Sequence, residues 1–367
     1  MTKSRKAVAT KALPKINSLT GLKVLAMLAI FWLHSPIINP TIDLGAQACL
    51  FLFVVSGFLV GYNSLKVKNP SEPTWKDSIS YFLKKFKQVW LLHALCAVVM
   101  LFLFTVPIFS GTTFIRFVLN LLLLQAWQPD PTNYFSFNGA TWFLSALLFC
   151  YFMAPLLCKT IRRGKKHIII AIIITVIIRI AAEFTMKHYP NEIFTVSAHV
   201  FPPVRACEFY LGILAVPVWK WLKAKFDALA PKKRLLIASA LELAIIAVSA
   251  AVLYGFRSSW LVGNYLCIYV PLIVIMACDA GIISKVLGLK IFRLFGAIQF
   301  SFYIMHQVII RIFNKYSVLG DQSRRVRTLG MFVTTVVLAI LYNYVILPAI
   351  IKLTAFISGK LRRNVVK

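Results

Sequence analysis

The stretch "KVLAMLAIFWLH", which runs from Lys23 to His34, decides the fold because it ends an almost continuous apolar run with a histidine. An apolar run of about 20 residues can cross the hydrocarbon core of a membrane as a helix. The two ionisable residues are eleven positions apart, which is about 16 Å along an ideal helix and only about 20° around it. We therefore expect Lys23 and His34 to share one face of a first membrane span.

The composition of the whole chain points to the same class of protein. Of the 367 residues, 60% are hydrophobic and 14% are charged, and the mean hydropathy is +0.80. Soluble domains are roughly half apolar and a quarter charged. Lysine and arginine number 41 against 11 aspartates and glutamates, a net charge of +30, but they cluster between apolar runs. Such clusters are typical of cytoplasmic loops in membrane proteins, so we predict a lipid bilayer as a partner and no nucleic acid.

The apolar runs predict an all-α, polytopic membrane helix bundle of about ten spans. The runs occupy residues 21–38, 46–63, 88–109, 141–161, 167–186, 200–222, 235–255, 261–280, 294–314 and 329–351. An even number of spans places the basic clusters in the cytoplasm, although the arginine-rich loop 321–328 then lies outside. The apolar run 112–127 does not fit as a crossing, and we expect it to be re-entrant or interfacial, packed within the protein.

We predict one membrane domain at residues 18–352, between a basic cytoplasmic N-terminus (1–17) and a basic cytoplasmic tail (353–367). The basic start before an apolar run is also typical of a secretory signal, but no small-residue cleavage site follows it, which favours an uncleaved first span. The seven cysteines form no C-x-x-C motif and no Cys/His cluster at ligand spacing. The sequence therefore predicts no disulfide framework and no metal site.

Three ionisable residues are expected at similar depth on three different spans: His34, His306 and Glu208. Ionisable residues inside a membrane cost a few kcal/mol each and are functional candidates by default. Arg205 precedes Glu208 by three residues, where the two side chains can form an ion pair. The alternative interpretation of that pair is a structural one, in which it fixes helix packing.

Two further spacings predict contacts between helices. Arg179 and Glu183 lie four residues apart on another span, and we interpret them as a structural ion pair. Gly57 and Gly61 have the G-x-x-x-G spacing that allows a second helix to approach closely.

Five short motifs occur in a fixed order along the chain. They are "KVLAMLAIFWLH" (23–34), "FLFVVSGFL" (51–59), "WFLSALLFCYFMAP" (142–155), "RACEFYLG" (205–212) and "SFYIMH" (301–306). Together these motifs resemble acyltransferase family 3, a family of integral-membrane enzymes. The chain departs from the family at Lys23, where arginine is commoner, and at Leu147, where glutamate is often found. The family's paired basic residues correspond to Lys84 and Lys87, or to Lys85 and Gln88.

The resemblance implies transfer of an acyl group, usually acetyl from acetyl-CoA, to a hydroxyl of a cell-surface glycan or a secreted small molecule. We expect a plasma-membrane enzyme with no permanently bound cofactor, for which acyl-CoA is a co-substrate. Because the phosphates of coenzyme A are anionic, we expect basic residues near the cytoplasm to attract the donor: Lys23, Lys84, Lys85 and Lys87.

We predict that His34 is the catalytic base or carries the acyl group, since the unperturbed pKa of histidine is near 6.5. Glu208 would orient an imidazole or bind acceptor hydroxyls, and His306 would donate to the developing oxyanion or bind the acceptor. The motifs also place Trp142 and Ser56 in the expected site.

Two alternatives from other classes remain at this stage. A proton-coupled transporter or exporter would also use intramembrane histidine and glutamate, but the sequence contains no repeated halves and no matching pair of Gly/Pro-broken spans. In a structural membrane protein the histidines would only bond across helices, at about 0.6 kcal/mol each.

Overall fold

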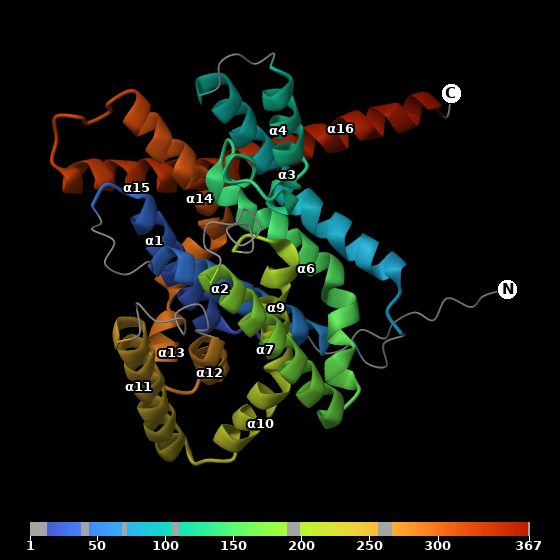
Figure 1. Ribbon diagram of the computed structural model, residues 1–367, viewed down its shortest axis with the longest axis vertical. Coiled ribbons are helices and arrows are strands. Elements are labelled where there is room, and N and C mark those ends of the chain that lie inside the picture. Colours follow the sequence, from blue (N-terminus) through green and yellow to red (C-terminus); the bar gives the residue numbers. More distant parts are fainter. Residues whose placement is uncertain are drawn as a thin grey trace.

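The computed structural model describes residues 13–37, 44–67, 72–104, 110–188, 199–255 and 266–365, and these residues form helices and turns without a strand. The longer helices are α1 (Asn17–His34), α2 (Leu44–Ser64), α3 (Trp75–Phe104), α6 (Trp142–Cys158), α7 (Lys165–His188), α11 (Pro231–Gly255), α14 (Lys290–Lys315), α15 (Arg324–Leu341) and α16 (Leu347–Val365). The shorter ones are α4 (Gly111–Leu121), α5 (Pro131–Tyr134), α9 (Pro202–Leu214), α10 (Val216–Asp227), α12 (Leu266–Met276) and α13 (Ile282–Leu287). In Figure 1 helices α1 and α2 cross the middle of the bundle. The all-α prediction is confirmed.

Eight helices in the described part of the chain are long and apolar enough to cross a membrane, and each coincides with a predicted span. The remaining two predicted spans are not found as helices of spanning length among the described residues. Residues 200–222 divide into α9 and α10, and the run 261–280, part of which lies outside the described residues, contains the 11-residue α12. The count of ten spans is therefore not confirmed.

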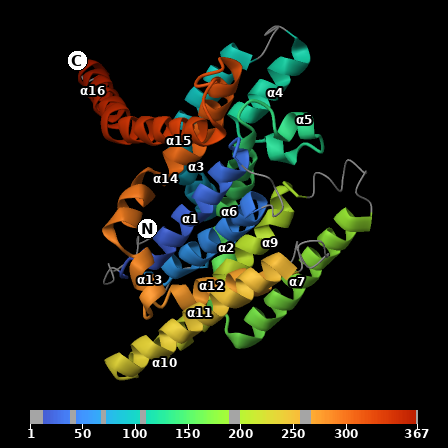
Figure 2. The same cartoon turned by 90° about the vertical axis from the view of Figure 1, so that its left-hand side faces the viewer.

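The predicted re-entrant run 112–127 forms α4, a turn at Leu123 and the 3-10 turn η1 (Gln125–Trp127). An 11-residue helix is about 16 Å long, half of what a crossing needs. Figure 2 shows α4 and α5 at one end of the bundle and α10 at the opposite end. This geometry explains why the run could not be counted as a full crossing, and its place relative to the bilayer stays a prediction.

Helices α2 and α9 pack backbone against backbone through glycines. A Cβ atom on Gly57 would lie 1.8 Å from the carbonyl oxygen of Phe209, and one on Gly212 would lie 2.0 Å from that of Val54. A Cβ on Gly61 would also lie 3.2 Å from the Cα of Ile213. The predicted close approach at Gly57 and Gly61 is confirmed, and α9 is the helix that makes it.

The N-terminal end of α1 is fixed by a residue far away in the sequence. The carboxylate of Asp279 accepts the backbone N–H groups of Asn17 and Ser18 at 3.3 and 3.2 Å, and the Ser18 hydroxyl donates to the carbonyl of Met276 at 2.7 Å. A negative charge at a helix N-terminus satisfies free N–H groups and complements the helix dipole. These hydrogen bonds fix the start of α1, the helix that carries Lys23 and His34, against the segment around Asp279.

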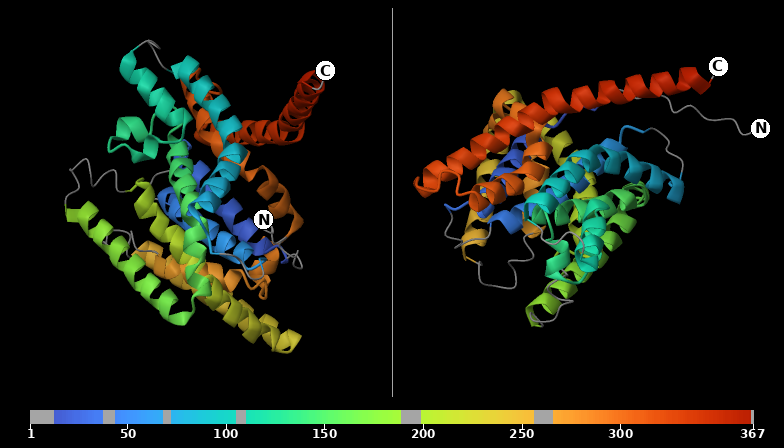
Figure 3. Two further views of the ribbon diagram at one scale, coloured as in Figure 1. Left: turned by 90° about the vertical axis from the view of Figure 1, so that its right-hand side faces the viewer. Right: turned by 90° about the horizontal axis from the view of Figure 1, so that it is seen from above.

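The C-terminal helix contains the predicted domain boundary between residues 352 and 353. Helix α15 continues through the π-helical turn η5 (Tyr342–Ile346) into α16, which includes both sides of that boundary. Figure 3 shows α16 extending beyond the rest of the bundle. The π-helical turn is bound to α14, because Asn343 donates to the Ser301 hydroxyl at 2.6 Å. Residues 1–12 of the predicted N-terminal segment lie outside the described residues.

Candidate functional site

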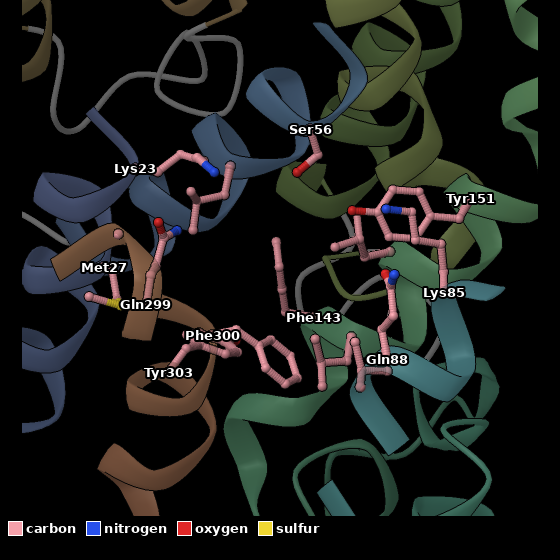
Figure 4. Close-up of a pocket in the computed structure, with 15 residues that line it drawn as sticks. Lys23, Met27, Ser56, Lys85, Gln88, Phe143, Tyr151, Gln299, Phe300 and Tyr303 are labelled. Carbon is pink, nitrogen blue, oxygen red and sulfur yellow. The ribbon is translucent and has the colours of Figure 1, made fainter. Parts of the chain in front are cut away.

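A cavity of about 260 Å³ lies between α1, α2, α3, α6 and α14 (Figure 4). Its walls are mainly apolar, with Met27 from α1, Leu52 from α2 and Phe143 from α6. Its polar lining consists of Lys23, Ser56, Lys85, Gln88, Tyr151, Gln299 and Tyr303. None of the described residues that line the cavity is acidic, so the cavity carries positive charge.

Two of the four lysines predicted to bind the donor line this cavity. Lys23 is half-buried, and Lys85 lies with its Nζ atom 5.6 Å from the ring centre of Tyr81 and 5.0 Å from that of Tyr151. Both distances are within the range of cation–π attraction. Lys84 and Lys87 are exposed and do not line the cavity.

The rotation of α3 brings one of the two possible motif pairs, Lys85 and Gln88, to the cavity. Lys85 and Gln88 both line the cavity, three residues apart on one face of the helix. The predicted ring of four lysines is reduced in the structure to Lys23 and Lys85. Ser56 from α2, another predicted site residue, lines the same cavity beside Tyr151 (Figure 4). It therefore shares the cavity with Lys23 and Lys85.

The two histidines predicted to meet do so at the interface of α1 and α14. His306 Nε2 lies 3.4 Å from His34 Nδ1, and the ring centres are 5.2 Å apart. His306 is 1% exposed, while His34 is half-buried at the last residue of α1. The structure thus places His34 at the end of its helix, whereas the predicted first span continues to residue 38.

Hydrogen bonds to backbone carbonyls set the tautomer of each neutral ring. A carbonyl oxygen only accepts, so the ring nitrogen that faces it carries the hydrogen. His306 Nδ1 faces the carbonyl of Tyr303 at 2.5 Å, which leaves the lone pair of His306 on Nε2. His34 Nδ1 faces the carbonyl of Ile30 at 2.8 Å, so its N–H points toward both that oxygen and His306 Nε2. The lone pair of neutral His34 is therefore on Nε2.

This arrangement is chemically suited to a base at His34. A proton taken up by His34 Nε2 would leave Nδ1–H directed at two acceptors, the Ile30 carbonyl and His306 Nε2. The resulting positive charge is stabilised without rearrangement, which is what an orienting group does for a catalytic histidine. Both nitrogens of His306 face protein groups, so the predicted donation from His306 to an oxyanion is not favoured by this geometry.

Tyr303 connects the histidine pair to the cavity. It lines the cavity, and its ring centre is 5.6 Å from that of His306. On α1, Met27 lines the cavity seven residues before His34, about 10 Å along the helix. The cavity and the histidine pair therefore lie along the same two helices.

The turn before α6 is bound to the same part of α14. Tyr303 donates its hydroxyl to the carbonyl of Ala140 at 2.6 Å, and the Ala140 N–H donates to Gln307 Oε1 at 2.6 Å. Asn138 Nδ2 donates to the carbonyl of Ile304 at 2.8 Å. Trp142, which begins α6, is buried directly after this turn. The predicted residue Trp142 thus directly follows the turn that Tyr303 binds, and its ring centre is 5.6 Å from that of His199.

Glu208 has partners other than the histidines. Its Oε1 atom lies 2.7 Å from Arg179 Nε on α7 and 3.2 Å from Arg205 NH1 on its own helix. Arg179 also binds Glu183 at 2.9 Å, which confirms that predicted pair. Arg179 has a second and shorter charged contact, to Glu208, which the spacing within its own helix does not predict. Among the described residues the structure shows no contact between Glu208 and His34 or His306.

Sequence reasoning missed Tyr303, Gln299 and Tyr151 as parts of the site. Tyr303 has a detectable signal, because it lies three residues before His306 in "SFYIMH" and so faces the same side of the helix. Gln299 precedes His306 by seven residues, again on that side. Tyr151 belongs to the quoted motif of residues 142–155, but its place at the cavity depends on how α6 packs against α2 and α3.

Known proteins match the chain in sequence. A family profile described as an acyltransferase domain matches residues 16–344. The acyltransferase MdmB of Streptomyces mycarofaciens is 29% identical over an alignment that covers 56% of this chain and 59% of the relative. The chain thus aligns with less than two thirds of that protein. No solved structure matches.

Proposed function

Because the chain belongs to acyltransferase family 3 and is therefore an acyltransferase, we propose that it moves an acyl group from acyl-CoA to a hydroxyl acceptor at His34. The observation that carries the proposal is the contact between His34 Nδ1 and His306 Nε2 at 3.4 Å, along the two helices that line a positively charged cavity. The resemblance favours acetyl-CoA as the donor and a cell-surface glycan or a secreted small molecule as the acceptor.

In the proposed reaction His34 Nε2 removes the proton from the acceptor hydroxyl. The hydroxyl oxygen forms a bond to the thioester carbonyl carbon, and the carbon–sulfur bond then breaks. The proton on His34 passes to the departing thiolate, which leaves as coenzyme A. His306 acts as a positioning residue, because it accepts from the Nδ1–H of His34 and so keeps the lone pair on Nε2.

The cavity supports the donor side of this reaction. Lys23 and Lys85 would attract the phosphates of coenzyme A, since no acidic residue of the described chain lines the cavity. Lys23 is eleven residues before His34, about 16 Å along α1. A donor held by its phosphates near Lys23 would direct its thioester arm toward the histidines.

The membrane arrangement belongs to the same proposal. We place the enzyme in the plasma membrane with both termini in the cytoplasm, where acyl-CoA is available. The basic residues between α2 and α3 and within early α3 support a cytoplasmic position for the open side of the cavity. The acceptor would then reach His34 from the opposite side.

The test compares His34→Ala with His167→Ala. His167 makes the same local contact as His34, from Nδ1 to the carbonyl four residues earlier, but it is exposed at the start of α7. Membrane vesicles that contain equal amounts of each variant are supplied with labelled acetyl-CoA, and acylated glycans and small molecules are identified by mass spectrometry. We expect acylation to be lost in His34→Ala and kept in His167→Ala. Wild-type acylation by a well-expressed His34→Ala variant would overturn the assignment.

A further inference from the structure

Two glutamines face each other across the cavity without a role in the proposed chemistry. Gln299 comes from α14 and Gln88 from α3, and Figure 4 shows their side-chain amides on opposite walls. Gln299 Oε1 is buried and accepts no hydrogen bond from the described residues. A buried acceptor without a partner costs about 1–3 kcal/mol, so it points to a ligand that donates a hydrogen bond.

We propose that Gln299 and Gln88 recognise the two secondary amides in the pantetheine arm of the donor. A primary amide both donates and accepts, which makes it complementary to a secondary amide. Pantetheine carries both of its amides between the phosphate end and the thioester. This inference rests on the proposed function, and it adds that the middle of the donor is bound by hydrogen bonds and its phosphate end by charge.

The order of the residues along the cavity agrees with this assignment. Lys23 and Gln299 lie near each other at one wall (Figure 4). Gln299 then precedes His306 by seven residues, about 10 Å along α14. Phosphate, amide and thioester would thus meet a lysine, a glutamine and the histidine pair in the order in which they occur in the donor. Other lining residues are apolar, among them Phe143 and Leu144, and suit the methylene groups between the amides.

Contacts to the phosphates and contacts to the amides of the donor can be tested by different variants. Removal of Lys23 would weaken binding of the phosphates without changing the amide contacts. Replacement of Gln299 by methionine, which is similar in length and also favours helices, would remove the amide contacts and leave the charge unchanged. A change at Lys23 therefore reports on binding of the phosphates, and a change at Gln299 reports on binding of the amides.

The experiment measures inhibition of acyl transfer from acetyl-CoA by two fragments of the donor. Pantetheine carries both amides and no phosphate, and adenosine 3′,5′-bisphosphate carries phosphates and no amide. We expect Gln299→Met to raise the inhibition constant for pantetheine about tenfold, equivalent to 1.4 kcal/mol, and to leave that for the bisphosphate unchanged. Gln88→Met should act in the same direction. Lys23→Ala should raise the inhibition constant for the bisphosphate and leave that for pantetheine unchanged. Gln322→Met, in an exposed turn, should change neither constant.

Equal effects of Gln299→Met on both fragments, or no effect on pantetheine, would overturn the amide assignment while acyl transfer itself stands. Absence of inhibition of the wild-type enzyme by pantetheine would also overturn it. If Gln299→Met does not accumulate, the same comparison with Gln88→Met decides. Failure of the proposed function would look different, because no acylated product would form from acetyl-CoA with the wild-type enzyme.

Discussion

The histidine pair and the arginine–glutamate cluster are both polar groups buried among membrane helices, yet they are satisfied in different ways. His34 and His306 are held by backbone carbonyls and by each other. Glu208 binds Arg179 at 2.7 Å and Arg205 at 3.2 Å, so its charge is compensated inside the protein. The proposed function requires the histidine pair to change its protonation, whereas the contacts of Glu208 favour a carboxylate that stays charged.

The two arginines of the cluster also differ from each other. Arg179 donates hydrogen bonds to Glu208 and Glu183, each from a different nitrogen. Arg205 is fully buried, and none of its three nitrogens makes a hydrogen bond with the described residues, although NH1 is in ionic contact with Glu208. The hydrogen bond between Arg179 on α7 and Glu208 on α9 is therefore the contact of the cluster that we expect to stabilise the fold most.

The largest expected effect is on stability, from Glu208→Ala. This change leaves Arg179 and Arg205 buried beside a lost charge, and breaking such a pair typically costs about 3–5 kcal/mol. We expect little folded protein after extraction into detergent, measured as the fraction that survives heating. Glu183→Ala is the matched control with a smaller expected loss, because the Glu183 side chain is 17% exposed and that of Glu208 is fully buried. A Glu208→Ala protein as stable as the wild type would remove the contrast between the two regions.

A smaller difference in stability is expected between variants of the two arginines. Arg179→Met removes two charge-assisted hydrogen bonds, and bonds of this kind contribute about 1.5–3 kcal/mol each. Arg205→Met removes one ionic contact and relieves the burial of a guanidinium without hydrogen bonds. We expect the thermal stability in detergent to fall clearly more for Arg179→Met than for Arg205→Met. The reverse order would assign the packing role to Arg205, as the sequence spacing suggested.

The smallest expected effects concern the donor side and leave stability unchanged. Lys23→Ala should raise the KM for acetyl-CoA about tenfold, the equivalent of about 1.4 kcal/mol, while Lys23→Arg should keep most activity because the positive charge stays. Lys84→Ala and Lys87→Ala should change KM by less than about twofold, since both side chains are exposed outside the cavity. An unchanged KM in Lys23→Ala would show that Lys23 does not bind the donor and lies only at the membrane–water interface.

The sequence predicted the helices well because membrane spans are defined by local composition. The same reasoning brought His34 and His306 together, since the depth of a residue follows from its distance along a span. It failed for Glu208, because its nearest partner Arg179 comes from another helix and depends on how α7 and α9 are rotated. The spacing to Arg205 was visible in the sequence, but the shorter contact was not.

Rotation about the helix axis also explains the outcome for the lysines. Lys84, Lys85 and Lys87 are close in sequence, but only the face of α3 that carries Lys85 and Gln88 lines the cavity. No single-sequence pattern fixes that rotation when the helix is apolar on several sides. The anchoring of α1 by Asp279 was hidden for the same reason, because the two segments are more than 260 positions apart.

The most direct test of the central claim is a double-mutant cycle on His34 and His306, with kcat for acyl transfer as the readout. We expect His306→Ala to lower kcat about a hundredfold and His34→Ala to leave only the residual rate that substrate binding alone supports. Both proteins should be as thermally stable as the wild type. Because His306 acts only through His34, the double variant should be no slower than His34→Ala alone. Wild-type kcat in His306→Ala, or a further loss in the double variant, would contradict the account.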